Sequence, residues 1–428
     1  MSITSLSFAG FSLAILIIYY LLPRRPQNIL LLAASCIFLV SWAWEFAAVF
    51  AVLTLLNFGL SHQLQENNPR RKWSLRGGVI LNIAALGYFK YSGYFIPQFL
   101  EGLDQLGIKT ESGFLQILLP VGLSFYIVQV ISYLLDINKK LIEPEDDLID
   151  FALYMVYFPR VTSGPIERAR DFLPKLKQAR VVDDAVFTRS FALVLLGLVR
   201  KVAIADVLLS FIPEDVFITP KAFNAAELVI WLLVYAFALY NDFAGYTDIV
   251  RGISGFFGIE LSRNFNTPYL ARNFTEFWQR WHISLSDWLR DYIFTPLTRA
   301  LLRRKYNSRH PITIIAPPLF TMLVSALWHN VAWNLILWGM LHGLYQVYER
   351  IRAVYFPSRP PQNHPAWRQV GAMILVFMLA VLAWVPFRMD LPVALDYWQG
   401  LFSPDRWQHF APEFDLFHHF YVISAILI

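Results

Sequence analysis

Long apolar runs recur from one end of the chain to the other, and they constrain the fold more than any other feature. Examples are FAGFSLAILIIYYLL near the start and QVGAMILVFMLAVLAWVPF near the end. About 17 to 25 apolar residues in a helix are enough to cross the hydrocarbon core of a bilayer. Only 16% of the residues are charged, whereas a soluble domain has about 25%. The sequence therefore predicts an all-α, polytopic membrane protein with about 10 to 12 transmembrane helices.

Ten segments have the length and composition of membrane spans. They are residues 5–22, 28–43, 45–63, 77–96, 114–136, 188–207, 224–241, 311–328, 331–349 and 368–387. Two shorter apolar pieces, 148–158 and 243–258, are too short to cross and are expected to be re-entrant. The last run, FHHFYVISAILI, is also shorter than a span, which predicts a truncated final helix. Because no soluble domain stands out, we expect residues 1–428 to form one membrane-embedded domain.

The distribution of Lys and Arg predicts the orientation in the membrane, because cytoplasmic loops carry the excess of these residues. Basic residues cluster at Arg24-Arg25, at 70–76 and at Lys139-Lys140, which are alternate connections between the predicted spans. The connection at 97–113 is acidic. The N-terminus is therefore expected outside. Pro23-Arg24-Arg25 follows the first run where a cleavage site would have small residues, so we expect a retained span and not a signal peptide. The net charge of +5 fits cytoplasmic loops, and no nucleic-acid partner is expected.

A basic, Trp-rich stretch at 272–309 predicts an amphipathic helix in the plane of the membrane interface, with interspersed charges on its wet face. The residues expected on its apolar side are Trp278, Trp281, Leu285, Trp288, Leu289 and Tyr292. His282 falls on the border between the two sides. A break is expected shortly before the helix, at Pro268.

Common catalytic and metal-binding motifs are missing from the sequence. It has no G-x-S-x-G elbow, P-loop, H-E-x-x-H or dinucleotide-binding fingerprint. The single cysteine, Cys36, excludes an internal disulfide and a cysteine-based metal site. Nine histidines are present, without strong metal-ligand spacing. We therefore expect neither a metal nor a bound cofactor.

His329 lies between two apolar runs, in the segment SALWHN. Ionisable side chains within membrane spans are costly and usually face a cavity or a partner. Both runs are expected to begin or end in the cytoplasm at their far ends, so they form a hairpin with the histidine at its apex. Pro317-Pro318 are expected to kink the first arm. From the residues alone, a core histidine bonded to a backbone carbonyl is an equal alternative.

A second polar set interrupts the apolar run at YNDFAGYTDIVRG, with Asp242, Tyr246 and Asp248. Asp242 and Tyr246 are four residues apart and share a face if the segment is helical. A charge network with the arginines of 251–290 is the alternative explanation. A third set, in YFPRVTSGPIERARDFLPKL, is expected to be structural.

These residues belong to motifs that resemble the membrane-bound O-acyltransferase (MBOAT) family. The resemblance is to its bacterial branch, which includes alginate and peptidoglycan O-acetylation proteins and the teichoic-acid D-alanylation protein. The motifs are LPVGLSFYIVQVISYLLDI at 119–137, GPIERARDFLPKL at 164–176, RKVAIAD at 200–206, the block 241–294 with FWQRWHISLSDWLRDY, and LWHNVAWNLILWGMLHG at 327–343.

The resemblance implies transfer of an acyl group from a cytoplasmic thioester to a hydroxyl of an exported or cell-wall polysaccharide. The leading hypothesis is that this group is acetyl. The invariant histidine of the family matches His329, expected to act as general base, and a second retained histidine matches His282. Further residues expected to bind substrates are Asp242, Tyr246, Asp248, Asn264, Asn266, Trp281, Ser286, Arg290, Trp328 and Asn330. Residues expected to dock the donor are Arg299, Arg303, Arg304 and Lys305.

The resemblance also implies partners and a location. The donor is expected to be acetyl-CoA or an acyl carrier protein thioester. The other expected partners are membrane lipids and an extracytoplasmic protein, an acetyltransferase or one that presents the acceptor. The expected location is the bacterial cytoplasmic (inner) membrane.

Three departures from the family pattern stand out. Asn330 replaces the glycine of the usual LWHG, which raises the question of the backbone conformation after the histidine. Asn241 replaces a tyrosine, and TPLTRALLRRKYNSRH replaces a glycine-rich stretch. The last departure keeps D-alanyl transfer to teichoic acid open as an alternative. Outside acyl transfer, the alternatives are a proton-coupled transporter or flippase with His329 and Asp242 as a relay, and a structural scaffold.

Overall fold

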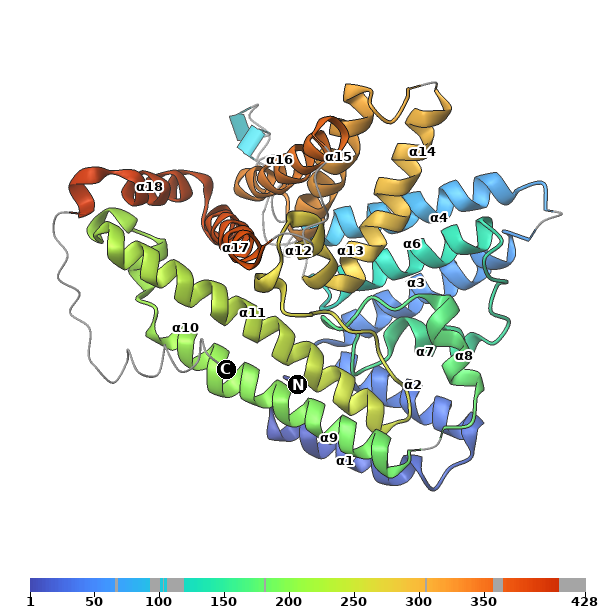
Figure 1. The fold of residues 1–428 in the computed structure, drawn as a ribbon. Coiled ribbons are helices and arrows are strands. Elements are labelled where there is room, and N and C mark those ends of the chain that lie inside the picture. The colour runs from blue at the N-terminus through green and yellow to red at the C-terminus, as the bar shows by residue number, and fades with distance from the viewer. Residues whose placement is uncertain are drawn as a thin grey trace. The chain divides into compact units, whose positions relative to one another are not determined.

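The structure is a computed structural model. It describes the chain apart from residues 66–67, 93–100, 103, 106–118, 181, 305, 357–364 and 408–428. The predicted last span and the acidic loop 97–113 therefore lie wholly or largely outside the described residues. The described part contains helices and no strand, which confirms the all-α prediction (Figure 1).

The longer elements follow one another along the chain as α-helices (Figure 1). In the first half they are α1 (Leu6–Tyr19), α2 (Arg24–Val40), α3 (Trp44–His62), α4 (Arg71–Leu86), α6 (Leu123–Asn138), α7 (Leu148–Val156), α8 (Ala169–Lys177), α9 (Asp184–Leu198) and α10 (Val207–Phe211). The second half contains α11 (Ala225–Phe256), α12 (Phe274–Arg280), α13 (Ile283–Leu289), α14 (Thr295–Arg303), α15 (Pro311–His329), α16 (Trp333–Tyr355), α17 (Ala366–Arg388) and α18 (Leu391–Phe402).

Four of the described helices are long and apolar enough to cross a membrane: α3, α11, α15 and α17. Two shorter apolar helices, α1 and α6, fall within other predicted spans. Four of these helices, α1, α3, α15 and α17, carry large exposed apolar side chains, as a lipid-facing surface requires. The chain is a multi-pass membrane protein.

Helix α11 differs from its prediction. The sequence predicts a span at 224–241 and a separate re-entrant piece at 243–258, but the structure has one helix of 32 residues. The polar residues between the two pieces are accommodated within the helix. Asn241 donates its side-chain amide to the carbonyl of Phe237 at 3.0 Å, and the Asp242 carboxylate pairs with Lys201 at 2.6 Å. With these groups satisfied, the helix continues through them.

The described contacts divide the chain into two compact units. The first unit consists of Met1–Leu196 and Tyr246–Ser262, and the second of Gly197–Gly245 and Arg263–Ile428. Each unit is described by itself. The expectation of a single membrane-embedded domain remains a prediction.

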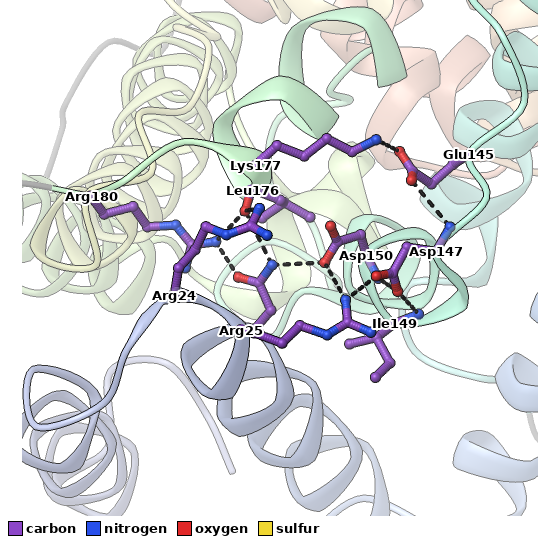
Figure 2. Close-up of polar contacts among 10 residues, drawn as sticks. Arg24, Arg25, Glu145, Asp147, Ile149, Asp150, Leu176, Lys177 and Arg180 are labelled. Carbon is purple, nitrogen blue, oxygen red and sulfur yellow. Dashed lines mark hydrogen bonds and ion pairs between the residues drawn. The ribbon is translucent and has the colours of Figure 1, made fainter.

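In the first unit, a cluster of charged residues joins the start of α2 to the loop before α7 and to the end of α8 (Figure 2). The Arg25 guanidinium pairs with the carboxylates of Asp147 and, at 3.8 Å, Asp150. Lys177 pairs with Glu145 at 2.7 Å. A polar cavity of about 440 Å³ lies among these side chains. The carboxylates at its wall are thus largely matched by basic groups of the same unit.

In the second unit, α15 and α16 form the hairpin that the sequence predicts. Helix α15 ends at His329 and α16 begins at Trp333. Pro317 and Pro318 lie inside α15, which stays helical through both. The two helices approach closely at Gly339, where an added Cβ would lie 2.7 Å from the carbonyl oxygen of Met322. The apolar core of this unit is built from α11, α12 and α15 to α18.

Candidate active site

The segment around His282 is broken, where the sequence predicts one amphipathic helix. Helix α12 ends at Arg280, and α13 begins at Ile283. Between them His282 has a φ of 43°, in the left-handed region that residues other than glycine rarely adopt. Asn264 stabilises this break, because its carbonyl oxygen accepts the N–H of Ile283 at 2.9 Å and its Oδ1 accepts that of Ser284 at 3.2 Å. Two N–H groups at the start of α13 are satisfied in this way.

The apolar side of this segment faces protein rather than lipid. Phe277 and Trp281 are stacked with ring centroids 5.7 Å apart, and Trp281 also contacts Trp384 of α17 at 4.8 Å. Trp281 is 6% exposed and belongs to the core of the second unit. The tryptophan pattern that indicated a membrane surface is therefore a packing pattern at this position.

The imidazole of His282 is 2% exposed. Its ring lies 4.8 Å from that of Phe243 and 6.1 Å from that of Trp328, centroid to centroid. Burial and, to a smaller extent, the proximity of His329 together lower the pKa of His282 to about 3. His282 is therefore a neutral imidazole at physiological pH.

His329 is the last residue of α15, and its side chain is half-buried. Its ring contacts Trp328 at 4.9 Å, Trp338 at 5.5 Å and Phe387 at 5.2 Å. The rings of His282 and His329 thus both contact the Trp328 indole. Two residues that are 47 positions apart in the sequence meet around one side chain.

A cavity of about 400 Å³ lies in the same unit, between α12, α13, α15 and α16. Its lining residues are Thr275, Trp278, Gln279, Ser286, Asp287, Leu289, Arg290, Phe294, Thr321, Met322, Gln346 and Arg350. Trp278 connects the cavity to the histidines, because its ring lies 5.9 Å from that of Trp338, which contacts His329. Of the predicted substrate-binding residues, Ser286 and Arg290 line this cavity.

The predicted polar residues of α11 have partners of their own. Asp242 pairs with Lys201, and Asp248 pairs with Arg251 at 3.3 Å. The Tyr246 hydroxyl shares a hydrogen bond with the hydroxyl of Thr162. Of these contacts, only the Asp248–Arg251 pair belongs to the predicted alternative, a charge network with the arginines of 251–290. Their predicted role in substrate binding stays a prediction.

Two further predicted residues lie on exposed backbone. Asn266 is exposed, and its N–H donates to the carbonyl of Arg280 at 2.9 Å. Asn330 is exposed and follows α15 with a φ of −168° and a ψ of 164°, which is extended backbone. Because any residue adopts this conformation, the asparagine in place of the family glycine imposes no strain after His329.

The predicted docking residues are exposed where the structure describes them. Arg299 and Arg303 lie on α14, and Arg304 directly follows it. Lys305 lies outside the described residues. The described side chains form a basic surface on a short amphipathic helix whose Leu301 is buried.

Several residues at the cavity or beside His329 were not predicted from the sequence: Gln346 and Arg350 line the cavity, and Trp338 and His342 pack next to its Trp278. Trp338, His342, Gln346 and Arg350 recur every four residues along α16, which places them on one face of the helix. His342 is fully buried among aromatic rings, and Trp338 is 1% exposed. The four-residue spacing predicts that these side chains share one helix face, but nothing in the sequence indicated that this face packs against α12 and α15.

Comparisons with known proteins agree with the motifs. Residues 142–387 match the family described as MBOAT, membrane-bound O-acyltransferase family. A probable alginate O-acetylase AlgI of Pseudomonas putida is 34% identical over 397 residues, covering 91% of this chain and 78% of the relative. A peptidoglycan O-acetyltransferase of Helicobacter pylori is 30% identical, covering 90% and 76%. A teichoic acid D-alanyltransferase of Streptococcus thermophilus is 28% identical, covering 59% and 62%.

Proposed function

The chain belongs to the membrane-bound O-acyltransferase family and is an acyltransferase, and from this premise we propose that it transfers an acetyl group from a cytoplasmic thioester to a hydroxyl of an exported or cell-wall polysaccharide. The names of the relatives at 30% identity or more, alginate O-acetylase and peptidoglycan O-acetyltransferase, support this substrate class. The proposed location is the bacterial cytoplasmic membrane, with the N-terminus outside.

The observation that carries the proposed mechanism is the meeting of His282 and His329 at Trp328. His329 is the general base, because it is the more accessible of the two and matches the invariant histidine of the family. Its neutral imidazole takes the proton of the acceptor hydroxyl as the hydroxyl oxygen attacks the thioester carbonyl carbon. A base placed in this way contributes about 10²- to 10⁴-fold to the rate.

The proposed reaction needs no co-reactant beyond the donor and the acceptor. The new C–O bond forms as the C–S bond of the thioester breaks, and the proton taken by His329 passes to the leaving thiolate. His282, kept neutral by burial, avoids placing a second positive charge beside the protonated His329. The rings of Trp328, Trp338 and Phe387 against His329 limit the access of water, which would otherwise compete as the acyl acceptor.

The donor is proposed to approach over the basic surface of α14 and to enter the cavity lined by Trp278. Either acetyl-CoA or an acyl carrier protein thioester carries negative charge that this surface attracts. Membrane lipids surround the chain, and an extracytoplasmic protein partner would complete delivery to the polysaccharide.

The proposal is tested in right-side-out membrane vesicles from cells that contain the protein and its extracytoplasmic partner, with labelled acetyl-CoA inside and an acceptor polysaccharide outside. Wild type is expected to label the acceptor. His329→Ala is expected to lose transfer by about 10²-fold or more. His310→Asn, which keeps a capping side chain at the other end of α15, is the matched control and is expected to retain transfer. Undiminished transfer by His329→Ala would refute the assignment of the base.

D-alanyl transfer is the second candidate, and the exposed basic surface of α14 favours it because carrier proteins dock through charge complementarity. A parallel reaction with D-alanyl carrier protein as the donor and teichoic acid as the acceptor separates the two. Labelling from that donor alone would replace the acetyl assignment.

A further inference from the structure

Arg350 lines the cavity between α12, α13, α15 and α16 without a counterion. In the part of the chain that the structure describes, no carboxylate pairs with this side chain, and its Nη1 is buried without a hydrogen-bond acceptor. The guanidinium lies over the ring of Phe294, 5.1 Å from the ring centroid. This stacking orients the group while leaving its N–H donors available.

The other charges of the cavity wall are matched. The guanidinium of Arg290 pairs with Asp287 at 2.6 Å and with Asp291 at 3.0 Å. Trp278 provides a second unused donor, since its Nε1 is buried and has no acceptor among the described residues. A buried guanidinium N–H and a buried indole N–H without acceptors are both costly. The wall is therefore suited to an anionic ligand with further hydrogen-bond acceptors.

The position of Arg350 on α16 indicates which part of a ligand it meets. Trp338, His342, Gln346 and Arg350 share one face. The twelve steps from Trp338 to Arg350 span about 18 Å at a rise of about 1.5 Å per residue. Trp338 contacts His329 at one end of this face. An extended phosphopantetheine arm covers a comparable distance from its phosphate to its thioester.

We propose that Arg350 binds the phosphate group of the phosphopantetheine arm of the donor, while the thioester at the other end of the arm reaches His329. This inference rests on the proposed function. It assigns the selection of phosphorylated donors to one side chain, and this selection applies equally to CoA and to a carrier protein, since both present the arm as a phosphate ester.

The test compares two donors that differ only in the phosphate, acetyl-4′-phosphopantetheine and acetyl-pantetheine. For Arg350→Gln, the KM of the phosphorylated donor is expected to rise roughly 10-fold, the loss typical of a charge-assisted hydrogen bond. The KM for acetyl-pantetheine and both kcat values are expected to stay within about twofold. Arg350→Lys, which keeps a point charge, is expected to retain part of the preference. Arg352→Gln, at an exposed position one half-turn further along the same helix, is the matched control.

An equal loss for both donors, or an unchanged preference for the phosphorylated donor, would overturn the proposal. A measurement on wild type needs no variant: 4′-phosphopantetheine is expected to quench tryptophan fluorescence in detergent at concentrations at which pantetheine does not. Equal quenching by the two, or displacement of 4′-phosphopantetheine by short-chain phosphatidylglycerol alone and not by CoA, would also overturn it. If wild type binds 4′-phosphopantetheine but acetylates no acceptor, the proposed function fails while this assignment stands.

Discussion

The Glu349 carboxylate accepts hydrogen bonds from both the backbone N–H and the hydroxyl of Thr275, at 3.0 and 2.8 Å. It also accepts the N–H of Phe274. A side chain near the end of α16 therefore provides the acceptor for the first backbone N–H groups of α12. Helix α12 carries Trp278 and leads directly into His282. One carboxylate on a neighbouring helix therefore fixes where this part of the site begins.

Replacement of Glu349 is expected to destabilise the second unit. Glu349→Ala leaves donors of Thr275 and Phe274 without their acceptor, which is expected to lower the free energy of unfolding by about 1 to 3 kcal/mol. Glu349→Gln keeps one acceptor oxygen and is expected to recover part of the loss. Thermal unfolding of the detergent-solubilised protein measures both. Identical melting temperatures for wild type and the alanine variant would contradict the capping role.

Close packing of α15 on α16 is expected to make Gly339 intolerant of a side chain. In Gly339→Ala the new Cβ would meet the Met322 carbonyl oxygen at 2.7 Å and the Ala326 Cβ at 2.9 Å. The helices must separate, at a cost of about 1 to 3 kcal/mol. Gly371→Ala on α17 is the matched control, because nothing lies within 4 Å of a Cβ there. A smaller loss of thermal stability in Gly339→Ala than in Gly371→Ala would show that the helices have room to adjust.

Acid is expected to weaken the structure through Glu276. Burial raises the pKa of this carboxyl, but hydrogen bonds and charges from Arg272 and Arg280 outweigh burial and hold the pKa at about 2. This value is below the unfolded value of about 4.5, so the unfolded state binds more protons between the two. The stabilisation by Glu276 is therefore full above about pH 4.5 and is lost as the pH falls towards 2.

The stability difference between wild type and Glu276→Gln measures this effect. It is expected to be largest above pH 5 and to shrink as denaturant unfolding is repeated at lower pH down to 3. The exposed Glu214→Gln serves as the control for general acid effects. A difference that stays constant over this range would mean that the ion pairs with Arg272 and Arg280 contribute nothing.

The basic surface of α14 is expected to contribute to donor affinity. The double change Arg303→Ala and Arg304→Ala removes two exposed charges and is expected to raise the Kd of acetyl-CoA or of an acylated carrier protein about 2- to 10-fold, with a weaker dependence on salt. Arg70→Ala with Lys72→Ala makes the same charge change at the exposed start of α4 in the first unit. Binding at two salt concentrations checks the result. Equal effects of the two double variants would assign the loss to net charge and remove the docking role.

The sequence was sufficient for the class of protein and for its family. Apolar runs of span length have one stable solution in lipid, because each backbone polar group must be satisfied within a helix. The helices α15 and α16 therefore appear where the runs predict them, and His329 lies at the end of the first. The order of the motifs along the chain likewise identified the family before any contact was known.

Only the tertiary structure revealed how distant segments meet. The Trp pattern around His282 reads as one amphipathic helix, yet Asn264, eighteen positions upstream, supplies the acceptors that start a new helix after the histidine. The sequence predicts that Asp242 ends an apolar span, yet Lys201 pairs with its carboxylate and the helix α11 continues through it. Arg350 follows the predicted span 331–349 and is expected at its cytoplasmic end. In the structure it lies on α16 and lines a cavity together with residues of α12 and α15. Periodicity reports which residues share a face of one helix. The partner of that face depends on packing among segments far apart in the chain, and no local pattern encodes it.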